Sequence, residues 1–392
     1  MKFFLADDLS GALETGAQLH AAGHRVRVPL SLAAWRVAED GALTGFSTES
    51  RNFPPDNAAR VVAAALAHGH SLGGALVFKK IDSTLRGSVG AEIRAIAAAL
   101  PGESLLIAPA NPAAGRTVRD GVLLVRGVPV ADTEFARDLA NPTRASRVAE
   151  VLALDGALTP RLLPLATVRE GAAACSAWLA GARGQGTRVF IAETETAADL
   201  AAVAAAWMGG ILVGSGAWAA TTLPRLSVPA VAAVNLPRGA TLFLCGSAHP
   251  RNRAQAARLV AAGVPLALLP VAVSSAPALA ACESALRVGG CAALMAGDDL
   301  RDPAAVQAAL AAALRAHDAR VPLARLFVTG GETACAACAA LGGESLLLVG
   351  ATEPGVALTM LTCAGGRTLS FAAKPGGFGD DESWVRVLRA WA

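Results

Sequence analysis

Residues 79–93 read KKIDSTLRGSVGAEI and place lysines, an aspartate, hydroxyl groups, an arginine and glycines between two apolar segments. The preceding segment, ALVF at 75–78, is typical of a buried strand, and the Ala-rich segment at 90–100 is typical of a helix. Charged groups at the end of a buried strand are unfavourable unless they are hydrogen-bonded or bind a ligand. Because ligands of open α/β sheets bind at the carboxyl ends of the strands, residues 79–93 predict a site for an anionic, hydroxylated small molecule.

An alternation of strands and helices continues on both sides of this segment. On the N-terminal side we predict strands at 3–6 and 25–31 and helices at 12–22 and 58–68. On the C-terminal side we predict strands at 104–110 and 188–192 and a helix at 196–207. Such alternation is typical of a doubly wound, mainly parallel sheet.

A proline-rich break near residues 226–240 is followed by a second alternation. It comprises predicted strands at 241–245, 265–271, 292–297, 325–330, 346–350 and 368–374 and helices at 254–262 and 303–317. We therefore expect an α/β fold of two doubly wound domains with mainly parallel sheets and an active site in the cleft between them. The expected domains are 1–228 and 241–392, joined by a linker at 229–240.

The composition argues against nucleic-acid and membrane partners. The 392 residues carry a net charge of only +3, and aromatic residues make up 4% of them with no tyrosine. Uncharged stretches at 200–224 and 259–282 are long enough for a membrane span, but glycines or prolines interrupt each. The N-terminal MKFFLADD has too short an apolar run for a signal peptide, so we expect a cytoplasmic protein.

The cysteines and histidines do not predict a metal site. All seven cysteines follow residue 174, and their odd number and irregular spacing favour reduced thiols. Cys335 and Cys338 form a C-x-x-C pair, but they lie in an Ala-rich helix where cysteine acts as a small hydrophobic residue. His20 and His24 are four residues apart, and Gly23 between them favours a solvated helix end.

The first candidate site residues are Asp7 and Asp8, at the end of the strand at 3–6. In the structural interpretation, one of them caps the following helix. In the functional interpretation, a carboxylate at the sheet edge takes a proton from a substrate hydroxyl group or holds a metal. The residues alone leave the two interpretations open.

Further polar residues follow other predicted strands of the first domain. Arg51, in the segment TESR at 48–51, lies either in a surface turn or in a position to bind a carboxylate with two hydrogen bonds. A single pocket is expected to be lined by Lys80, Asp82, Ser83, Thr84 and Arg86. The loop APANPAAGR at 108–116 adds Asn111 and Arg116 as weaker candidates.

The second domain contains three glycine-containing strand ends. Gly246-Ser247 and Gly330-Gly331-Glu332-Thr333 each end a strand and begin a helix, and KPGGFGDD at 374–381 is rich in glycine. This arrangement directs backbone N–H groups at phosphates. The chain contains neither a P-loop motif nor a G-x-G-x-x-G after the first strand of either domain. A domain for a polyhydroxy acid and another for phosphates together predict phosphoryl transfer.

The sequence resembles the four-carbon acid sugar kinases, which phosphorylate threonate, erythronate or oxo-tetronate with ATP. The resemblance covers nearly the whole chain and rests on ADDLSGA, KKIDSTLRGSVGAE, APANPAAGR, CGS with Gln255 downstream, TGGETA, EPGV and KPGGFG, in the family's order. It implies an N-terminal sugar-acid-binding domain, a C-terminal nucleotide-binding domain, and ATP with Mg²⁺ as cofactors. The expected product is a 4-phosphate ester.

The resemblance also implies roles for individual residues. Sugar-acid binding falls to Asp8, Arg51 and the stretch Lys80, Ile81, Asp82, Ser83 and Thr84, with Arg86 beside it. ATP binding falls to Ser247, Gly330, Gly331, Glu332, Thr333 and Gly376. We expect Asp8 to act as the base, with Asp7 or Asp82 as alternatives.

The chain departs from the family's usual pattern at several positions. Ser10 replaces a usual Thr, Glu14 and Glu193 replace usual Asp residues, and Pro375 replaces a small hydroxyl residue. The loop after Ser247 lacks the usual Ser/Thr pattern, with Ala248 and Asn252 in those places. These departures bear on the ATP loop and on the choice of substrate.

Two other functions fit parts of the sequence. A non-catalytic sugar-acid sensor would use the same cleft, and the altered loop after Ser247 favours it. An NAD(P)-linked dehydrogenase suits the repeated α/β pattern but lacks the glycine motif. The stereoisomer of the acid and the oligomeric state, including a homo-oligomer, stay open.

Overall fold

The computed structural model describes residues 1–37, 40–138, 141–222, 236–247, 249–269, 276–297 and 302–391. The chain has a mixed α/β fold and divides into two compact units. The first unit contains residues 1–25 and 36–222 of the described chain, and the second contains residues 26–35 and 236–391. Most of the predicted linker at 229–240 lies outside the described residues.

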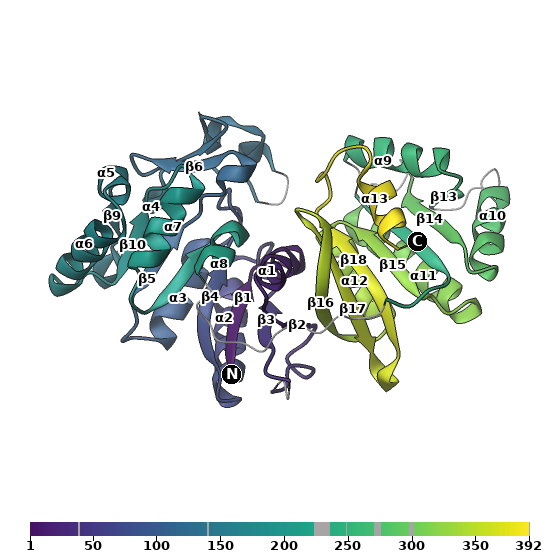
Figure 1. The fold of residues 1–392 in the computed structure, drawn as a ribbon, viewed down its shortest axis with the longest axis horizontal. Helices are drawn as coiled ribbons and strands as arrows, with labels where there is room; N and C mark the ends of the chain where they lie inside the picture. Colours follow the sequence, from purple (N-terminus) through teal and green to yellow (C-terminus); the bar gives the residue numbers. More distant parts are fainter. Residues whose placement is uncertain are drawn as a thin grey trace. The chain divides into compact units, whose positions relative to one another are not determined.

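The first unit is built on a seven-stranded sheet (Figure 1). In spatial order its strands are β3 (Leu43–Ser47), β1 (Lys2–Ala6), β4 (Ala75–Lys80), β11 (Ile211–Gly214), β5 (Leu105–Ala108), β10 (Val189–Ala192) and β9 (Arg161–Leu163). Every neighbouring pair is parallel. The strands are almost continuously apolar and buried, as expected for a parallel sheet covered by helices.

Helices connect these strands, and a small antiparallel sheet is added to the first unit. The helices are α1 (Leu9–Ala21), α2 (Pro55–Ser71), α3 (Val89–Ala99), α4 (Val148–Leu152), α5 (Leu165–Arg169), α6 (Ala172–Gly184), α7 (Ala197–Ala206) and α8 (Gly216–Thr222). The small sheet consists of β6 (Arg116–Arg119), β7 (Val122–Val125) and β8 (Val128–Pro129). Helix α1 packs against α8 and α2 packs against α3, while α1, α2 and α8 each contact β4.

The second unit contains an eight-stranded stretch of sheet. In spatial order its strands are β13 (Leu266–Leu269), β14 (Cys291–Ala296), β12 (Thr241–Cys245), β15 (Arg325–Thr329), β18 (Thr368–Lys374), β17 (Val356–Cys363), β16 (Gly343–Glu353) and β2 (Val26–Pro29). The first five strands are parallel, and the last three add antiparallel pairs. The helices are α9 (Pro250–Ala261), α10 (Ala276–Arg287), α11 (Pro303–Arg320), α12 (Gly331–Ala340) and α13 (Ser383–Ala390).

The core of the second unit is rich in aromatic residues. Phe243 on β12 and Phe327 on β15 have ring centroids 5.2 Å apart, and Trp384 of α13 lies 5.8 Å from Phe327. Aromatic pairs at such separations add to the stabilisation from buried area. This core fixes β12 and β15, whose carboxyl ends carry two of the glycine-containing loops.

The structure confirms the predicted α/β class with mainly parallel sheets, and two features were not predicted. Residues 26–35 lie in the second unit, where β2 pairs antiparallel with β16 through Val28 and Leu346. Strand β17 pairs antiparallel with both of its neighbours. Local periodicity identifies a strand, but it does not indicate which sheet the strand joins.

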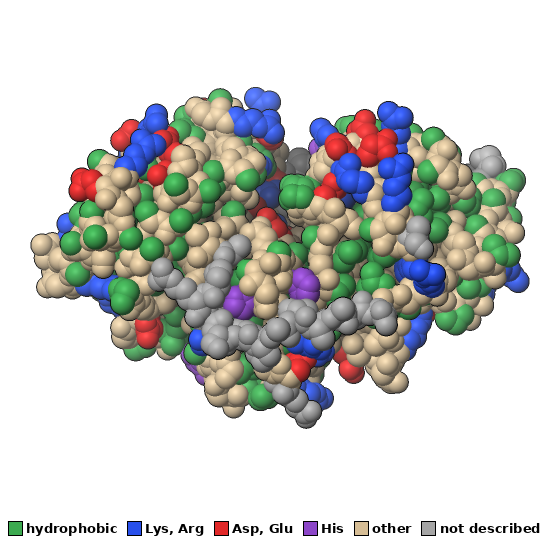
Figure 2. Space-filling model, in the orientation of Figure 1, with side chains coloured by type: hydrophobic (Ala, Val, Ile, Leu, Met, Phe, Trp, Pro, Cys, Tyr) green, Lys and Arg blue, Asp and Glu red, His purple; other side chains and the backbone are tan. Residues whose placement is uncertain are grey.

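The uncharged stretches form short helices and strands in their described parts. Residues 200–222 fall in α7, β11 and α8, and residues 259–269 fall in α9 and β13. No described helix has both the length and the apolar character that a membrane crossing requires. On the face shown in Figure 2, acidic and basic side chains are interspersed on each unit.

The predicted solvated helix end is confirmed for residues 21–23, which are exposed, but not for His24. His24 follows α1 but is buried, with 3% exposure, instead of solvated. Burial lowers the pKa of His24. None of the seven cysteines forms a disulfide, and the described residues contain no group of three or more His, Cys, Asp or Glu side chains placed to hold a metal.

Candidate functional site

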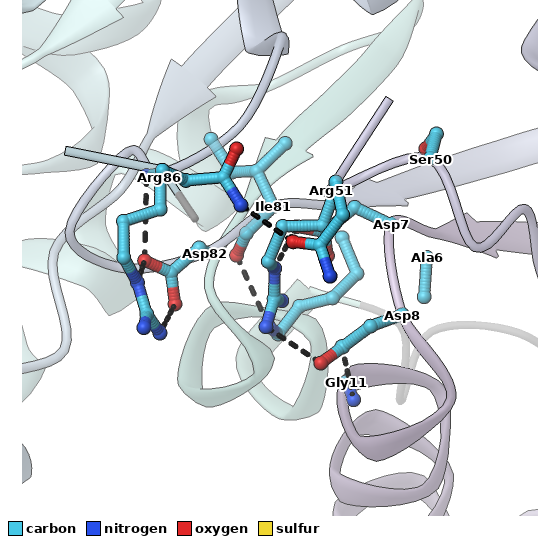
Figure 3. A network of polar contacts seen from close by, with 12 residues as sticks. Ala6, Asp7, Asp8, Gly11, Ser50, Arg51, Ile81, Asp82 and Arg86 are labelled. Atoms are coloured by element: carbon cyan, nitrogen blue, oxygen red, sulfur yellow. Dashed lines mark hydrogen bonds and ion pairs between the residues drawn. The ribbon is translucent and has the colours of Figure 1, made fainter. Parts of the chain in front are cut away.

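The first candidate site lies where three neighbouring parallel strands end. Strands β3, β1 and β4 are adjacent, so the loops that follow them begin at the same edge of the sheet. These loops contain Arg51, the pair Asp7 and Asp8, and the segment 81–86. Figure 3 shows these side chains gathered in one polar network.

Arg51 is held between the two aspartates of the first loop. Its Nε donates to Asp7 Oδ2 at 2.8 Å and its Nη1 donates to Asp8 Oδ2 at 2.6 Å. Burial raises the pKa of Asp7, but the charges of Arg51, Lys80 and Lys79 more than offset it, so that pKa is lowered overall. Burial opposes the charge of Arg51, yet Asp7 and Asp8 raise its pKa well above the ordinary value. The loops after β1 and β3 therefore bring two carboxylates and a permanent cation into direct contact.

The structure confirms the structural interpretation for Asp8 and also places its second oxygen on Arg51 at the sheet edge. It is the N-cap of α1, with extended backbone, and its Oδ1 accepts from the Gly11 N–H at 2.7 Å. Its Oδ2 accepts the hydrogen bond from Arg51 Nη1. A Cβ on Gly11 would lie 2.7 Å from Asp8 Oδ1 and 3.2 Å from Lys80 Nζ, so glycine is required where these two side chains approach the helix.

Lys80 and Ile81 contribute to this edge in different ways. The Lys80 ammonium group is buried, donates to the Ile81 carbonyl at 3.0 Å and lies 3.7 Å from Glu14 Oε2. The Ile81 side chain is fully buried in the core, so only its backbone faces the site. Glu14 thus reaches Lys80 from the second turn of α1.

Asp82 organises its own loop. Its Oδ2 accepts from Arg86 Nε at 2.9 Å and from the Thr84 hydroxyl group, and its Oδ1 accepts from Arg86 Nη2 at 3.1 Å. Burial raises the pKa of Asp82, but Arg86 and Arg51 hold it well below the ordinary value. Thr84 is therefore directed inward at Asp82, whereas Ser83 is only half-buried.

Arg86 extends this network towards a second aspartate. Its Nη1 donates to Asp138 Oδ2 at 3.0 Å. Its guanidinium group lies 5.5 Å from the centre of the Phe135 ring, and that of Arg116 lies 5.6 Å from the same ring. Arg116 is thus near the site. Asn111 is paired with Arg116 through two backbone hydrogen bonds of 2.9 Å.

A buried ion pair beside the site was not singled out from the sequence. Lys79 Nζ lies 2.7 Å from Glu92 Oε2, with side chains 0% and 1% exposed. The Ser50 hydroxyl group donates to the other Glu92 oxygen and lies 2.7 Å from the Thr48 hydroxyl group. This chain of contacts fixes the residue before Arg51. The sequence feature that could have indicated this pair is Glu92, a lone acidic residue in the apolar helix segment VGAEI at 89–93.

The second candidate site lies in the second unit, again at the carboxyl ends of neighbouring strands. Strands β12, β15 and β18 are adjacent and parallel, and they lead into Gly246-Ser247, the segment 330–333 and the segment 375–379. A Cβ on Gly376 would lie 2.8 Å from Ser247 Oγ, and one on Gly246 would lie 2.4 Å from Thr333 Oγ1. The structure therefore brings the predicted residues of the three loops into contact.

Helix α12 begins directly after a glycine. Gly330 is its N-cap with φ of +102°, a conformation that favours glycine, and it provides no side-chain hydrogen bond to the first turn. The backbone N–H groups of residues 331–333 lie at the positive end of the helix. Such a helix end, lined by glycines, fits a phosphate group.

Two departures from the family pattern have clear contacts. Glu193 accepts from the Gly121 N–H at 2.7 Å and from the Leu165 N–H at 2.8 Å, so it ties two backbone segments together. Asn252 is fully buried and accepts from Lys374 Nζ at 3.1 Å. Ala248 lies outside the described residues.

Comparison with known proteins assigns each half of the chain to a family. Residues 3–222 match the model of a sugar-binding N-terminal domain, and residues 242–383 match that of a nucleotide-binding C-terminal domain. The D-threonate kinase of Salmonella typhimurium is 32% identical, over 98% of this chain and 96% of its own length. The D-threonate kinase of Cupriavidus necator is 35% identical, over 99% and 96%. The 3-oxo-tetronate kinase of the same organism is 29% identical, over 98% and 96%.

Solved structures share the fold. A Salmonella typhimurium LT2 protein described as a tRNA synthase superimposes with a TM-score of 0.84 at 22% identity, covering 100% of this chain and 99% of its own. A Haemophilus influenzae protein gives 0.79 at 19% identity, with 100% of both chains covered. These likenesses concern the fold alone.

Proposed function

The chain belongs to the four-carbon acid sugar kinase family, and we propose that it transfers the γ-phosphate of ATP to the terminal 4-hydroxyl group of a four-carbon sugar acid. The candidate substrates are threonate, erythronate and 3-oxo-tetronate, on which relatives are named as acting. The main support is the grouping of Asp8, Arg51 and Lys80 at one sheet edge of the half that matches the sugar-binding model.

We propose residues 1–228 as the sugar-acid-binding domain and residues 241–392 as the nucleotide-binding domain, joined at 229–240. The family matches at 3–222 and 242–383 support this division. Residues 26–35 belong to the second unit by their contacts, so the polypeptide of the first domain would contribute a strand to the second. Transfer requires the acceptor hydroxyl group and the γ-phosphate to meet, as the predicted cleft would allow.

Asp8 is the proposed base that takes the proton from the 4-hydroxyl group. Its side chain is 18% exposed, compared with 2% for Asp7 and 12% for Asp82. Asp82 is bound through both oxygens to Arg86, which favours a structural role. Asp8 is therefore the carboxylate of the three that a substrate reaches most easily.

Arg51 and Lys80 are the proposed partners of the substrate carboxylate. A guanidinium group offers five N–H donors, and only two of those of Arg51 are used by Asp7 and Asp8 in the described contacts. Lys80 adds a compact charge next to Asp8. We propose the Ile81 backbone, Asp82, Ser83, Thr84 and Arg86 as the remaining wall of the sugar-acid site.

ATP is the proposed phosphate donor, bound by Ser247, Gly330, Gly331, Glu332, Thr333 and Gly376. The close approach of Gly376 to Ser247 and the glycine at the N-cap of α12 fit a phosphate chain. Mg²⁺ usually takes its ligands from the phosphates, water and one or two carboxylates, so no protein cage is needed. Glu332, in the first turn of α12, is the carboxylate beside this loop. When bound, Mg²⁺ neutralises charge on the phosphates.

A coupled assay of ADP release tests the proposal. With ATP and Mg²⁺, we expect turnover with at least one of D- or L-threonate, D- or L-erythronate and the 3-oxo-tetronates. No turnover across this panel, with no thermal stabilisation by ATP, would contradict it and revive the sensor interpretation. That alternative is not favoured, because the curated relatives are named as kinases.

A further inference from the structure

We propose that Lys374 is a positioning residue of the nucleotide site, whose ammonium group holds the glycine-rich segment 375–379 in the shape that phosphate binding requires. The inference rests on the proposed function of the second unit. Lys374 is the last residue of β18 and is 1% exposed, so it does not contact solvent as a lysine on a loop usually would.

The ammonium group lies at the centre of a ring of oxygen atoms. Its Nζ is 2.8 Å from the Gly376 carbonyl, 3.1 Å from that of Phe378 and 3.3 Å from that of Pro375. Asn252 Oδ1 on α9 completes the ring at 3.1 Å. Carbonyl dipoles directed at one point repel each other, so the segment needs a cation at its centre to adopt this shape.

The inward carbonyls determine where the amides of the segment point. In a trans peptide the N–H is directed opposite to the C=O. Because the carbonyls of Pro375 and Gly376 point at Lys374, the N–H groups of Gly376 and Gly377 point away from it. Gly376 is also the residue whose Cβ would lie 2.8 Å from Ser247 Oγ. Lys374 thus turns two backbone donors outward from its own position in the loop that contacts Ser247, as in an anion-binding nest.

Helix α9 holds the same segment from the other end. Gln255 is fully buried, and its Nε2 donates to the carbonyls of Phe378 at 3.1 Å and Asp380 at 2.6 Å. Asn252 lies one turn earlier on the same helix. Both residues therefore supply buried polar groups to the segment. Arg251 of the same helix is exposed and donates from Nη1 to the Gly379 carbonyl at 3.0 Å, whereas Lys374 supplies a buried charge to the carbonyls of residues 375, 376 and 378.

Lys374 changes its protonation state within the pH range of ordinary assays. Burial lowers the pKa of Lys374 to about 8, with Arg251 of α9 acting in the same direction. Cys245 of β12 and Glu353 of β16 oppose the shift. The ammonium form is thus present at neutral pH and is lost above about pH 8. ATP affinity should then fall as the pH rises through this range.

The test compares ATP binding by the full chain and two variants, measured by isothermal titration without sugar acid. Lys374→Met removes the charge at similar length, and Lys374→Arg retains a charge that does not titrate. The control is Arg367→Met, just before β18, which removes an ion pair with Asp318 at 2.5 Å elsewhere in the second unit. For Lys374→Met we expect the Kd for ATP to rise about tenfold or more, with the KM for sugar acid unchanged within about twofold.

The pH profile separates positioning from a general structural role. For the unmodified chain we expect the Kd for ATP to rise by up to about tenfold per pH unit above the pKa of Lys374. Lys374→Arg and Lys374→Met should lose this dependence, while Arg367→Met should keep both the Kd and its dependence. If Lys374→Met does not fold, the profile of the unmodified chain decides.

Three results would overturn the inference. A flat profile of the unmodified chain between pH 7 and pH 9 would do so, whatever the variants do, because the pKa of Lys374, about 8, lies within this range. A Kd for ATP in Lys374→Met that stays within about twofold of the value for the unmodified chain would by itself overturn the inference. Absence of ATP binding by the unmodified chain would instead overturn the proposed function and, with it, this inference.

Discussion

Arg51, between Asp7 and Asp8, determines how the carboxylates of the first unit behave. It lowers the pKa of Asp7 against the effect of burial. It also occupies one oxygen of Asp8, whose other oxygen caps α1. As the proposed base, Asp8 would be oriented from two sides, and orientation is a large part of phosphoryl-transfer catalysis.

For Asp8→Asn we expect kcat to fall by about two orders of magnitude or more, while ATP binding is retained. Asparagine caps a helix about as well as aspartate, so the start of α1 and the thermal stability should be preserved. Steady-state kinetics and an ATP titration measure the two effects separately. Turnover close to that of the unmodified chain would remove Asp8 from the role of base and direct attention to Asp7 or Asp82.

For Arg51→Ala we expect the KM for the sugar acid to rise by about tenfold or more, because a bidentate partner of the carboxylate is lost. The KM for ATP should stay the same. Arg119→Ala is a suitable control, since Arg119 is a half-exposed arginine of the first unit, paired with Glu195 at 2.7 Å. An unchanged KM for the acid would place its carboxylate elsewhere.

The lowered pKa of Asp82 lets us predict how the stability of the first unit depends on pH. Its pKa lies well below the ordinary 3.8 in the folded chain, so it stabilises the fold above that value. The contribution is lost as the pH falls through the folded pKa. In Arg86→Met the main opposing charge is absent, so burial brings the folded pKa of Asp82 up towards or above its ordinary value. Asp82 then contributes less stability above that value, so the variant should be less stable at neutral pH and should lose less stability as the pH is lowered than the unmodified chain does. Thermal melts at stepwise lower pH measure this difference, and coincident profiles for the two proteins would contradict it.

At the scale of elements, the contact between β4 and α3 depends on the buried pair of Lys79 and Glu92. Removing one partner leaves an uncompensated charge, so Lys79→Met or Glu92→Leu alone should lower the free energy of unfolding by about 3–5 kcal/mol. The double variant Lys79→Met, Glu92→Leu should lose less, because no buried charge remains unpaired. Urea unfolding of both single variants and the double variant completes the cycle. Additive losses would mean that the two side chains do not interact.

The sequence predicted elements best where a segment was long and periodic. Strands β1, β4, β12 and β15 and helices α2 and α11 lie close to their predicted positions, because apolar periodicity and flanking glycines mark them. The sequence also predicted which strand ends would carry polar residues. It did not predict that Glu92 would pair with Lys79, since the pairing depends on how α3 packs against β4.

At the scale of the molecule, two results lay beyond local patterns. Residues 26–35 join the second unit, although they lie within the first part of the chain. His24, immediately before them, is buried instead of solvated. Both depend on contacts between residues far apart in the sequence, and periodicity contains no information on such contacts.

The most direct measurement is the ³¹P NMR spectrum of the product formed from ATP and the accepted sugar acid. A phosphate on the primary 4-hydroxyl group couples to the two protons of its carbon, so the account predicts a phosphomonoester triplet. A doublet would indicate a secondary hydroxyl group as acceptor, and an uncoupled signal would indicate an acyl phosphate on the carboxylate. Either of these two results would contradict phosphorylation of the terminal hydroxyl group.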